Sequence, residues 1–119
     1  MLFLILLFSK FKHFLADFPL QGKYMLGKFK GGNEWILPLL AHVGVHGLFT
    51  LGLCLLVNPS MWYLFLLDMS IHFVMDRVKA SKNLLGRWDF SSRYYWWVLG
   101  FDQLIHGITD LLVVFLLVK

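Results

Sequence analysis

Near its C-terminal end the sequence reads Phe101-Asp102-Gln103-Leu104-Ile105-His106-Gly107-Ile108-Thr109-Asp110. Three ionisable residues, Asp102, His106 and Asp110, are spaced four residues apart within an otherwise apolar segment. Residues four apart lie on one face of an α-helix. Ionisable groups at membrane depth are costly, and they normally face a protein interior that supplies partners for them. The pattern therefore predicts a membrane-spanning helix with one polar edge turned toward other helices.

The same spacing recurs in each of the three other apolar segments, in the pairs His13/Asp17, His42/His46 and His72/Asp76. With a rise of ~1.5 Å per residue, all four pairs fall in the same half of a bundle built from these segments. Independent polar substitutions would have no reason to converge in this way. We expect the four polar edges to meet in one interior cluster.

The composition is typical of a membrane protein. The chain has 119 residues, of which 59% are hydrophobic, and its mean hydropathy is +0.69, far above the values of soluble domains. Four apolar stretches, about 2–18, 35–57, 60–79 and 94–118, approach the ~20 residues that a span requires. The first has no basic region before it and no cleavage site after it, so we expect a retained span. The sequence thus predicts one all-α domain, 1–119, folded as an integral membrane four-helix bundle.

The distribution of positive charge predicts the orientation of this bundle. Lysine and arginine gather in the loops 19–34 and 80–93, whereas the turn at Asn58-Pro59 carries none. Loops rich in positive charge remain cytoplasmic. We therefore expect basic loops in the cytoplasm and both termini on the outer side of a bacterial inner membrane. Ser60 is expected to cap the third helix.

Imidazole and carboxylate groups together suit divalent Zn, Mn or Fe, and a bundle core is a natural place for such a site. The single residue Cys54 provides no cysteine-based metal motif. The predicted ligands, enough for two ions, are His13, Asp17, His42, His46, His72, Asp76, Asp102 and His106. Residues expected to orient these ligands from behind are Gln21, Asp68, Gln103 and Asp110.

Such a centre would suit a hydrolase that acts on an anionic, phosphate-containing substrate from the cytoplasmic side. Asp76 or Asp102 would serve as the base, and Lys79 would hold the phosphate. A basic rim would attract the substrate, either a small molecule or a lipid headgroup. The other candidate residues of this rim are Lys28, Lys82, Arg87 and Arg93.

Two other functions use the same residues. A carrier or channel for protons or metal ions would employ them as a relay. A structural or regulatory membrane protein would need them only to form hydrogen bonds between helices. The coincidence of spacing, depth and face favours the metal site. The expected partners are the lipid bilayer and a second copy of the chain, with no specific nucleic acid.

Two lysines in the first apolar segment require separate interpretation. Lys10 shares the polar stripe of His13 and Asp17, and we expect it to pair with Asp17 or to extend its ammonium group toward water. Lys12 falls on the far side of the same helix.

Several runs resemble the hallmarks of a known family, namely His13-Phe14-Leu15-Ala16-Asp17-Phe18-Pro19-Leu20-Gln21, His72-Phe73-Val74-Met75-Asp76 with Lys79, Asp102-Gln103-Leu104-Ile105-His106, and Ala41-His42 with His46. The family consists of small bacterial and phage membrane proteins and is catalogued as domain of unknown function three-three-zero-seven. The resemblance covers nearly the whole chain. It implies a four-span bundle with the same polar residues at its centre, and it brings no established activity.

Overall fold

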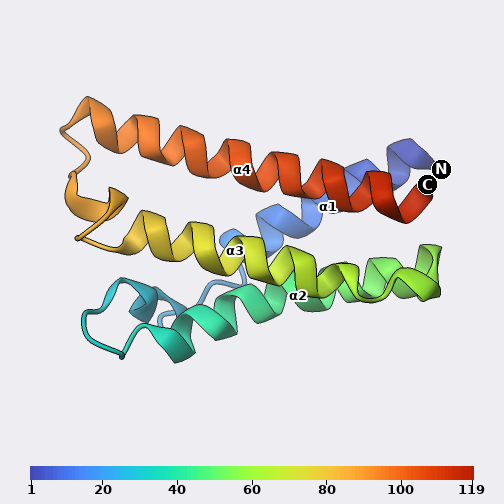
Figure 1. Cartoon of the computed structure of the whole chain (residues 1–119), viewed down its shortest axis with the longest axis horizontal. Coiled ribbons are helices and arrows are strands. Elements are labelled where there is room, and N and C mark those ends of the chain that lie inside the picture. The colour runs from blue at the N-terminus through green and yellow to red at the C-terminus, as the bar shows by residue number, and fades with distance from the viewer.

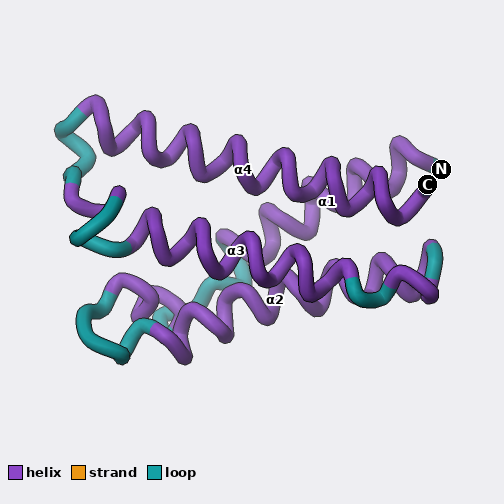
Figure 2. Tube along the Cα trace, in the orientation of Figure 1, coloured by secondary structure: helices purple, strands orange, loops and turns teal.

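A computed structural model describes all residues from 1 to 119. It contains four α-helices, α1 (Leu2–Asp17), α2 (Ile36–Val57), α3 (Leu64–Ala80) and α4 (Arg93–Val118). Three short 3-10 turns lie between them, η1 (Met25–Phe29), η2 (Pro59–Met61) and η3 (Leu85–Arg87). Figure 2 shows helices and loops without any strand, so the predicted all-α class is confirmed.

The four helices form an up-and-down bundle (Figure 1). Helix α1 packs against α2 and α4, and α3 packs against the same two helices. The connections 18–35 and 81–92 lie together at one end, which we call the loop end. Both termini and the turn 58–63 lie at the opposite end, which we call the terminal end. The two basic connections are therefore neighbours.

Three of the predicted helical segments agree with α1, α2 and α4 to within one residue at each end. The third helix begins at Leu64 rather than at residue 60, because Pro59–Met61 forms the turn η2. The prediction that Ser60 caps this helix is wrong, since its hydroxyl donates to Oδ1 of Asn58 (2.7 Å). A side-chain cap is found instead at α4, where Oγ of Ser92 accepts from the amide of Tyr94 (3.2 Å).

Two helices, α2 with 22 residues and α4 with 26, are long and apolar enough to cross a membrane. Helices α1 and α3 have 16 and 17 residues, which correspond to about 24 Å and 26 Å of helix. All four helices expose large apolar side chains, for example Phe3 (72%), Leu56 (84%), Val74 (62%) and Phe115 (60%). An apolar surface of this extent requires a cover of lipid or protein.

The interior is divided along the bundle axis. At the terminal end, the four helices share one apolar cluster of Ile5, Leu53, Cys54, Leu64, Val113, Val114 and Leu117. Between this cluster and the loop end, the buried side chains are mainly histidine, aspartate and lysine. The fold therefore places a polar interior between the loop end and the apolar cluster, and it continues past the middle of the bundle, since buried Thr50 and Asp110 lie beyond the midpoints of α2 and α4.

Glycines hold both basic connections against the helices. A Cβ on Gly27 would lie 2.8 Å from Cγ of Pro38, so the close approach of η1 to α2 depends on this glycine. A Cβ on Gly86 would lie 2.7 Å from the backbone of Ala80, at the end of α3. The amide of Gly86 donates to the carbonyl of Ser81 (2.8 Å). These contacts close the loop end over the polar interior.

Candidate metal centre

Polar side chains repeat every four residues on one edge of each helix. The repeats are His13 and Asp17 on α1, His42, His46 and Thr50 on α2, Asp68, His72 and Asp76 on α3, and Asp102, His106 and Asp110 on α4. Because a step of four residues is close to one helical turn, each repeat forms a ladder along its helix. The ladders face the bundle axis, and all of their members are buried or half-buried.

The middle rung of the ladders is a layer of four histidines, which we call the histidine layer: His13, His46, His72 and His106, one from each helix. The ring centroids of His72 and His106 are 4.1 Å apart, and those of His46 and His72 are 4.2 Å apart. His13 lies 5.2 Å from His46 and 5.3 Å from His106. Four imidazoles therefore occupy a single level of the interior.

The next rung toward the loop end is the carboxylate layer: Asp17, His42, Asp76 and Asp102, again one from each helix. Nε2 of His42 lies 3.1 Å from Asp76 and 3.4 Å from Asp17. Between the layers, Nε2 of His46 lies 2.9 Å from Asp17, and Nε2 of His106 lies 3.7 Å from both Asp76 and Asp102. The two layers are thus in direct contact.

The potential ligand atoms of these layers fall into groups of three that lie within 4.8 Å of one another. The groups are Asp17/His42/His46, Asp76/Asp102/His106, His13/His46/His72 and His13/Asp17/His106. The structure thus brings together all eight ligands predicted from the sequence. The first two groups share no residue, so they offer separate ligand sets for two ions. Imidazole and carboxylate donors in such sets suit Zn, Mn or Fe.

Hydrogen bonding satisfies few of the buried imidazoles. Both ring nitrogens of His13, His72 and His106, and Nδ1 of His42 and His46, make no hydrogen bond of good geometry, although Nε2 of His13 lies 2.9 Å from Asp17 and Nε2 of His72 lies 3.1 Å from Asp68. Only the contact of His46 with Asp17 has hydrogen-bond geometry. Buried polar atoms without partners are rare and costly. Unpartnered nitrogens that converge with carboxylates fit cation ligation better than a closed hydrogen-bond network.

A third layer borders the histidine layer on the side of the terminal end. We call it the lysine layer, and its members are Lys10, Lys12, Thr50, Asp68 and Asp110. Nζ of Lys12 donates to Oγ1 of Thr50 (2.8 Å) and to Asp68 (2.9 Å), and it lies 3.7 Å from Asp110. The hydroxyl of Thr50 also donates to Asp68. Nζ of Lys10 donates to Asp110 (3.2 Å). Here two carboxylates are balanced by two ammonium groups.

The predicted pairing of Lys10 with Asp17 and the predicted position of Lys12 are both wrong, whereas the 55% exposure of the Lys10 side chain agrees with the alternative that its ammonium group extends toward water. Lys10 pairs with Asp110 rather than Asp17, and Lys12 is buried (3% exposed) rather than on the far side of its helix. Because α1 packs against both α2 and α4, it buries a wider arc than one polar stripe. The long stem of Lys12 then reaches Asp68 from a neighbouring position on that arc.

Three of the four residues expected to orient the ligands contact a ligand side chain. Asp68 lies 3.1 Å from Nε2 of His72, and Asp110 lies 3.7 Å from Nδ1 of His13, so both lie behind a histidine. Gln103, although exposed, donates to Asp102 (3.2 Å).

Gln21 acts differently from this expectation, because it contacts no ligand side chain. Its amide donates to the backbone carbonyl of Asp17 (3.0 Å) and accepts from Nζ of Lys28 (2.9 Å). Gln21 thus positions a lysine.

Two lysines border the carboxylate layer at the loop end. Nζ of Lys79 lies 3.1 Å from Asp102 and 3.9 Å from Asp76, and Nζ of Lys28 lies 3.8 Å from Asp76. Burial lowers the pKa of Lys28, while the nearby carboxylate of Asp76 acts in the opposite direction. The layer holds three carboxylates, including Asp17, against these two ammonium groups. The remaining negative charge favours the binding of cations.

The outer members of the predicted basic rim, Lys82, Arg87 and Arg93, are exposed and do not contact the layers. Lys82 lines a polar pocket of about 500 Å³ together with Lys30 and Arg77. These residues make the loop end cationic without taking part in the cluster.

Sequence reasoning did not identify the lysine layer as a unit. Thr50 carries a usable signal, since it follows His46 by four residues and continues the ladder of α2. Lys12 carries none, because it lies off the register of the α1 ladder.

Comparison with known proteins places the chain in a family. No curated protein and no solved structure matches it. A family model does match, over residues 2–119, and its description is "Protein of unknown function (DUF3307)". This match covers essentially the whole chain and agrees with the resemblance carried by the polar motifs. The chain therefore belongs to the DUF3307 family of proteins of unknown function.

Proposed function

We propose that the protein is a four-span protein of the bacterial inner membrane whose interior binds two divalent cations, Zn, Mn or Fe. With these ions it would hydrolyse an anionic, phosphate-containing substrate from the cytoplasmic side. The observation that carries the proposal is the convergence of eight imidazole and carboxylate ligands from all four helices. A packing role alone would not require so many unpartnered ring nitrogens in one place.

The membrane part of the proposal rests on surface chemistry and charge. All four helices expose many large apolar side chains around the bundle, and α2 and α4 have the length of full spans. The shorter α1 and α3 fit a bilayer that thins slightly around them. Both basic connections lie at the loop end, which by the positive-inside rule would face the cytoplasm. The carboxylate layer would then lie near the cytoplasmic surface.

When bound, a divalent cation supplies a Lewis acid for phosphate oxygens and lowers the pKa of a coordinated water. The residues of the chain have the complementary roles. Asp76 and Asp102 lie together with His106, and either carboxylate would take the proton that the attacking water releases. The water oxygen bonds to phosphorus and the ester P–O bond breaks. The proton then passes to the departing oxygen.

Lys79 would bind the substrate phosphate. Its ammonium group lies at the edge of the cluster, 3.1 Å from Asp102, and its side chain is 22% exposed. Cations held by Asp76 and Asp102 would repel this ammonium group, which would then be free to turn toward the substrate. A lysine used in this way binds phosphate as a point charge.

Metal analysis of the purified protein tests the proposal. The wild-type protein is expected to retain two divalent ions per chain after loading with Zn²⁺ or Mn²⁺, and to hydrolyse p-nitrophenyl phosphate. Asp102→Asn removes a ligand of one group, so it should lower metal content and reduce hydrolysis about 100-fold or more. Asp89→Asn is the matched control, because Asp89 is exposed in the loop 81–92 and its carboxylate accepts hydrogen bonds from the amide and hydroxyl of Ser91, far from the cluster in sequence and outside its ligand groups.

Two results would contradict the proposal. Wild-type protein without stoichiometric metal after loading would remove its basis. Equal metal content and equal hydrolysis in Asp102→Asn and Asp89→Asn would show that the cluster is not the site.

One observation favours a second candidate, a carrier of protons or metal ions. The polar interior continues past the histidine layer into the lysine layer, and a pocket of about 220 Å³ lies beside Lys10, His13 and Asp110. A carrier needs polar groups that extend toward the other membrane surface. Uptake of Zn²⁺ into proteoliposomes, abolished as fully by Asp110→Ala as by His72→Ala, would support the carrier over the hydrolase.

A further inference from the structure

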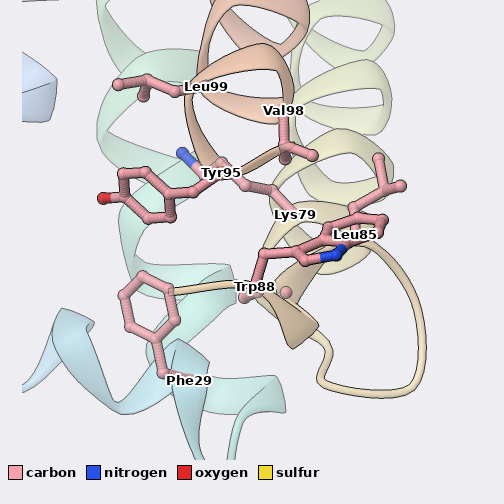
Figure 3. Close-up of a pocket in the computed structure, with 9 residues that line it drawn as sticks. Phe29, Lys79, Leu85, Trp88, Tyr95, Val98 and Leu99 are labelled. Carbon is pink, nitrogen blue, oxygen red and sulfur yellow. The ribbon is translucent and has the colours of Figure 1, made fainter. Parts of the chain in front are cut away.

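A pocket of about 180 Å³ lies at the loop end beside Lys79 (Figure 3). Its apolar walls come from η1, η3, the loop after η3 and the first turns of α4. The wall residues that matter here are Phe29, Leu85, Trp88, Tyr95, Val98 and Leu99. Lys79 is the only charged residue among the residues that line the pocket. The pocket is therefore apolar with a single cationic point.

Lys79 connects this pocket to the candidate metal centre. Its side chain forms part of the wall, while Nζ lies 3.1 Å from Asp102 and 3.9 Å from Asp76. Both aspartates belong to the group that includes His106. One ammonium group thus separates the apolar pocket from a set of potential metal ligands. A molecule in the pocket would have its polar end at Lys79.

The size of the pocket limits what it can hold. An apolar cavity of about 150 Å³ is sufficient to bind benzene. A volume of about 180 Å³ therefore accommodates one aromatic ring or one short branched alkyl group, and not a whole acyl chain. Phe29, Trp88 and Tyr95 supply aromatic surface for stacking with such a group.

We propose that this pocket binds an apolar group, aryl or short branched alkyl, attached directly to the phosphate of the substrate. The phosphate then lies at Lys79, next to Asp76 and Asp102. This inference rests on the proposed function and narrows it to phosphoesters of apolar alcohols. A simple phosphate without the apolar group gains only the charge interaction, so the pocket provides the selectivity.

Binding of two phosphoesters tests the pocket directly. Titration calorimetry of the Mn²⁺-loaded protein in detergent micelles compares phenyl phosphate with methyl phosphate, which carry the same charged group. Burial of the ring should make phenyl phosphate bind at least about tenfold more tightly. Val98→Phe fills the pocket and should remove this preference without weakening methyl phosphate. Val118→Phe makes the same change on an exposed turn of α4 at the terminal end and should behave as the wild type.

Equal affinities of the wild type for the two phosphoesters would overturn the inference, as would a preference that persists in Val98→Phe. Leu99→Phe, a second change that fills the pocket, gives the same test if Val98→Phe does not fold. Metal content, measured on the same samples, separates this inference from the proposed function. Stoichiometric metal with equal affinities overturns the pocket alone. A preference for phenyl phosphate in protein that binds no metal supports the pocket and overturns the metal-dependent hydrolase.

Discussion

Lys12 places its ammonium group between the carboxylates of Asp68 and Asp110, in a position where its side chain is 3% exposed. The hydroxyl of Thr50 completes this arrangement. A charge buried so deeply is stable only while its partners are present. The lysine layer therefore neutralises two aspartates that would otherwise be isolated beside the histidine layer.

Removal of the Lys12 charge should strongly destabilise the protein. Lys12→Met leaves Asp68 buried and without its ammonium partner, and loss of one partner of a buried pair typically costs about 3–5 kcal/mol. Thermal unfolding in detergent micelles measures the change. The double variant Lys12→Met/Asp68→Asn removes both charges and should recover most of the lost stability.

Lys10 provides the matched control for this substitution. Its side chain is 55% exposed, and Lys12 remains 3.7 Å from Asp110 when Lys10 is replaced. Lys10→Met should therefore cost about 1 kcal/mol or less. Similar losses of stability in the two single variants would show that the lysine layer is not the buried ion-pair system described above.

At the scale of the elements, the ladders on the four helices were predictable because α-helical periodicity is regular. Spacings of four residues placed His42 with His46 and Asp102 with His106 on shared faces, and the apolar runs located three helices almost to the residue. The burial of Lys12 was not predictable in this way. It depends on how α1 lies between two neighbours, which is a property of the packed bundle and not of one helix.

The start of α3 shows the same limitation for a helix end. Ser60 is a preferred capping residue, yet Pro59 initiates the turn η2 and the helix begins only at Leu64. Local propensity alone could not separate a short 3-10 turn from the first turn of the helix. The apolar pocket beside Lys79 was also beyond prediction, because its lining residues come from η1, α3, η3, the loop after η3 and α4, which form one wall only in the fold.

The turn η3 depends on Gly86, and this dependence gives a prediction for the element. Gly86→Ala would place a methyl group 2.7 Å from the backbone of Ala80, so η3 must move away from α3. We expect a loss of stability of about 1–3 kcal/mol and weaker binding of phenyl phosphate, because Leu85 and Trp88 move with the turn.

Gly22→Ala serves as the control for this change. A Cβ at Gly22 would meet no atom within 4 Å, and the residue does not have positive φ. This substitution should be neutral or slightly stabilising. Unchanged stability and unchanged binding in Gly86→Ala would show that η3 does not depend on the close approach of Gly86 to the backbone of Ala80.

At the scale of the whole molecule, polar and apolar interiors are stacked along one axis. The apolar cluster at the terminal end includes residues of all four helices, followed by the lysine, histidine and carboxylate layers and then the basic loop end. In the proposed membrane-spanning state, the helices would have little hydrophobic drive to associate with one another. The layers therefore supply specific contacts that fix which helices are neighbours.

Cysteine labelling tests the proposed orientation of the molecule. In a Cys54→Ala background, Ser60→Cys and Lys119→Cys place a thiol at the terminal end, and Lys30→Cys and Asn83→Cys place one at the loop end. A membrane-impermeant maleimide should label the first two variants in intact spheroplasts and the other two only after lysis. The reverse pattern would refute the orientation, and labelling of all four variants in intact cells would refute a spanning bundle.

The termini have a consequence for how the chain could be rearranged. Ile5 in α1 and Leu117 in α4 belong to the same apolar cluster, and both chain ends lie at one end of the bundle (Figure 1). A short glycine-serine linker could therefore join residue 119 to residue 1, and the circle could be reopened between Asn83 and Leu84. Such a circular permutant would keep every layer while changing the order in which the helices emerge from the ribosome. If it folds to the same bundle, the contacts of the final structure determine which helices become neighbours, and the order of synthesis does not.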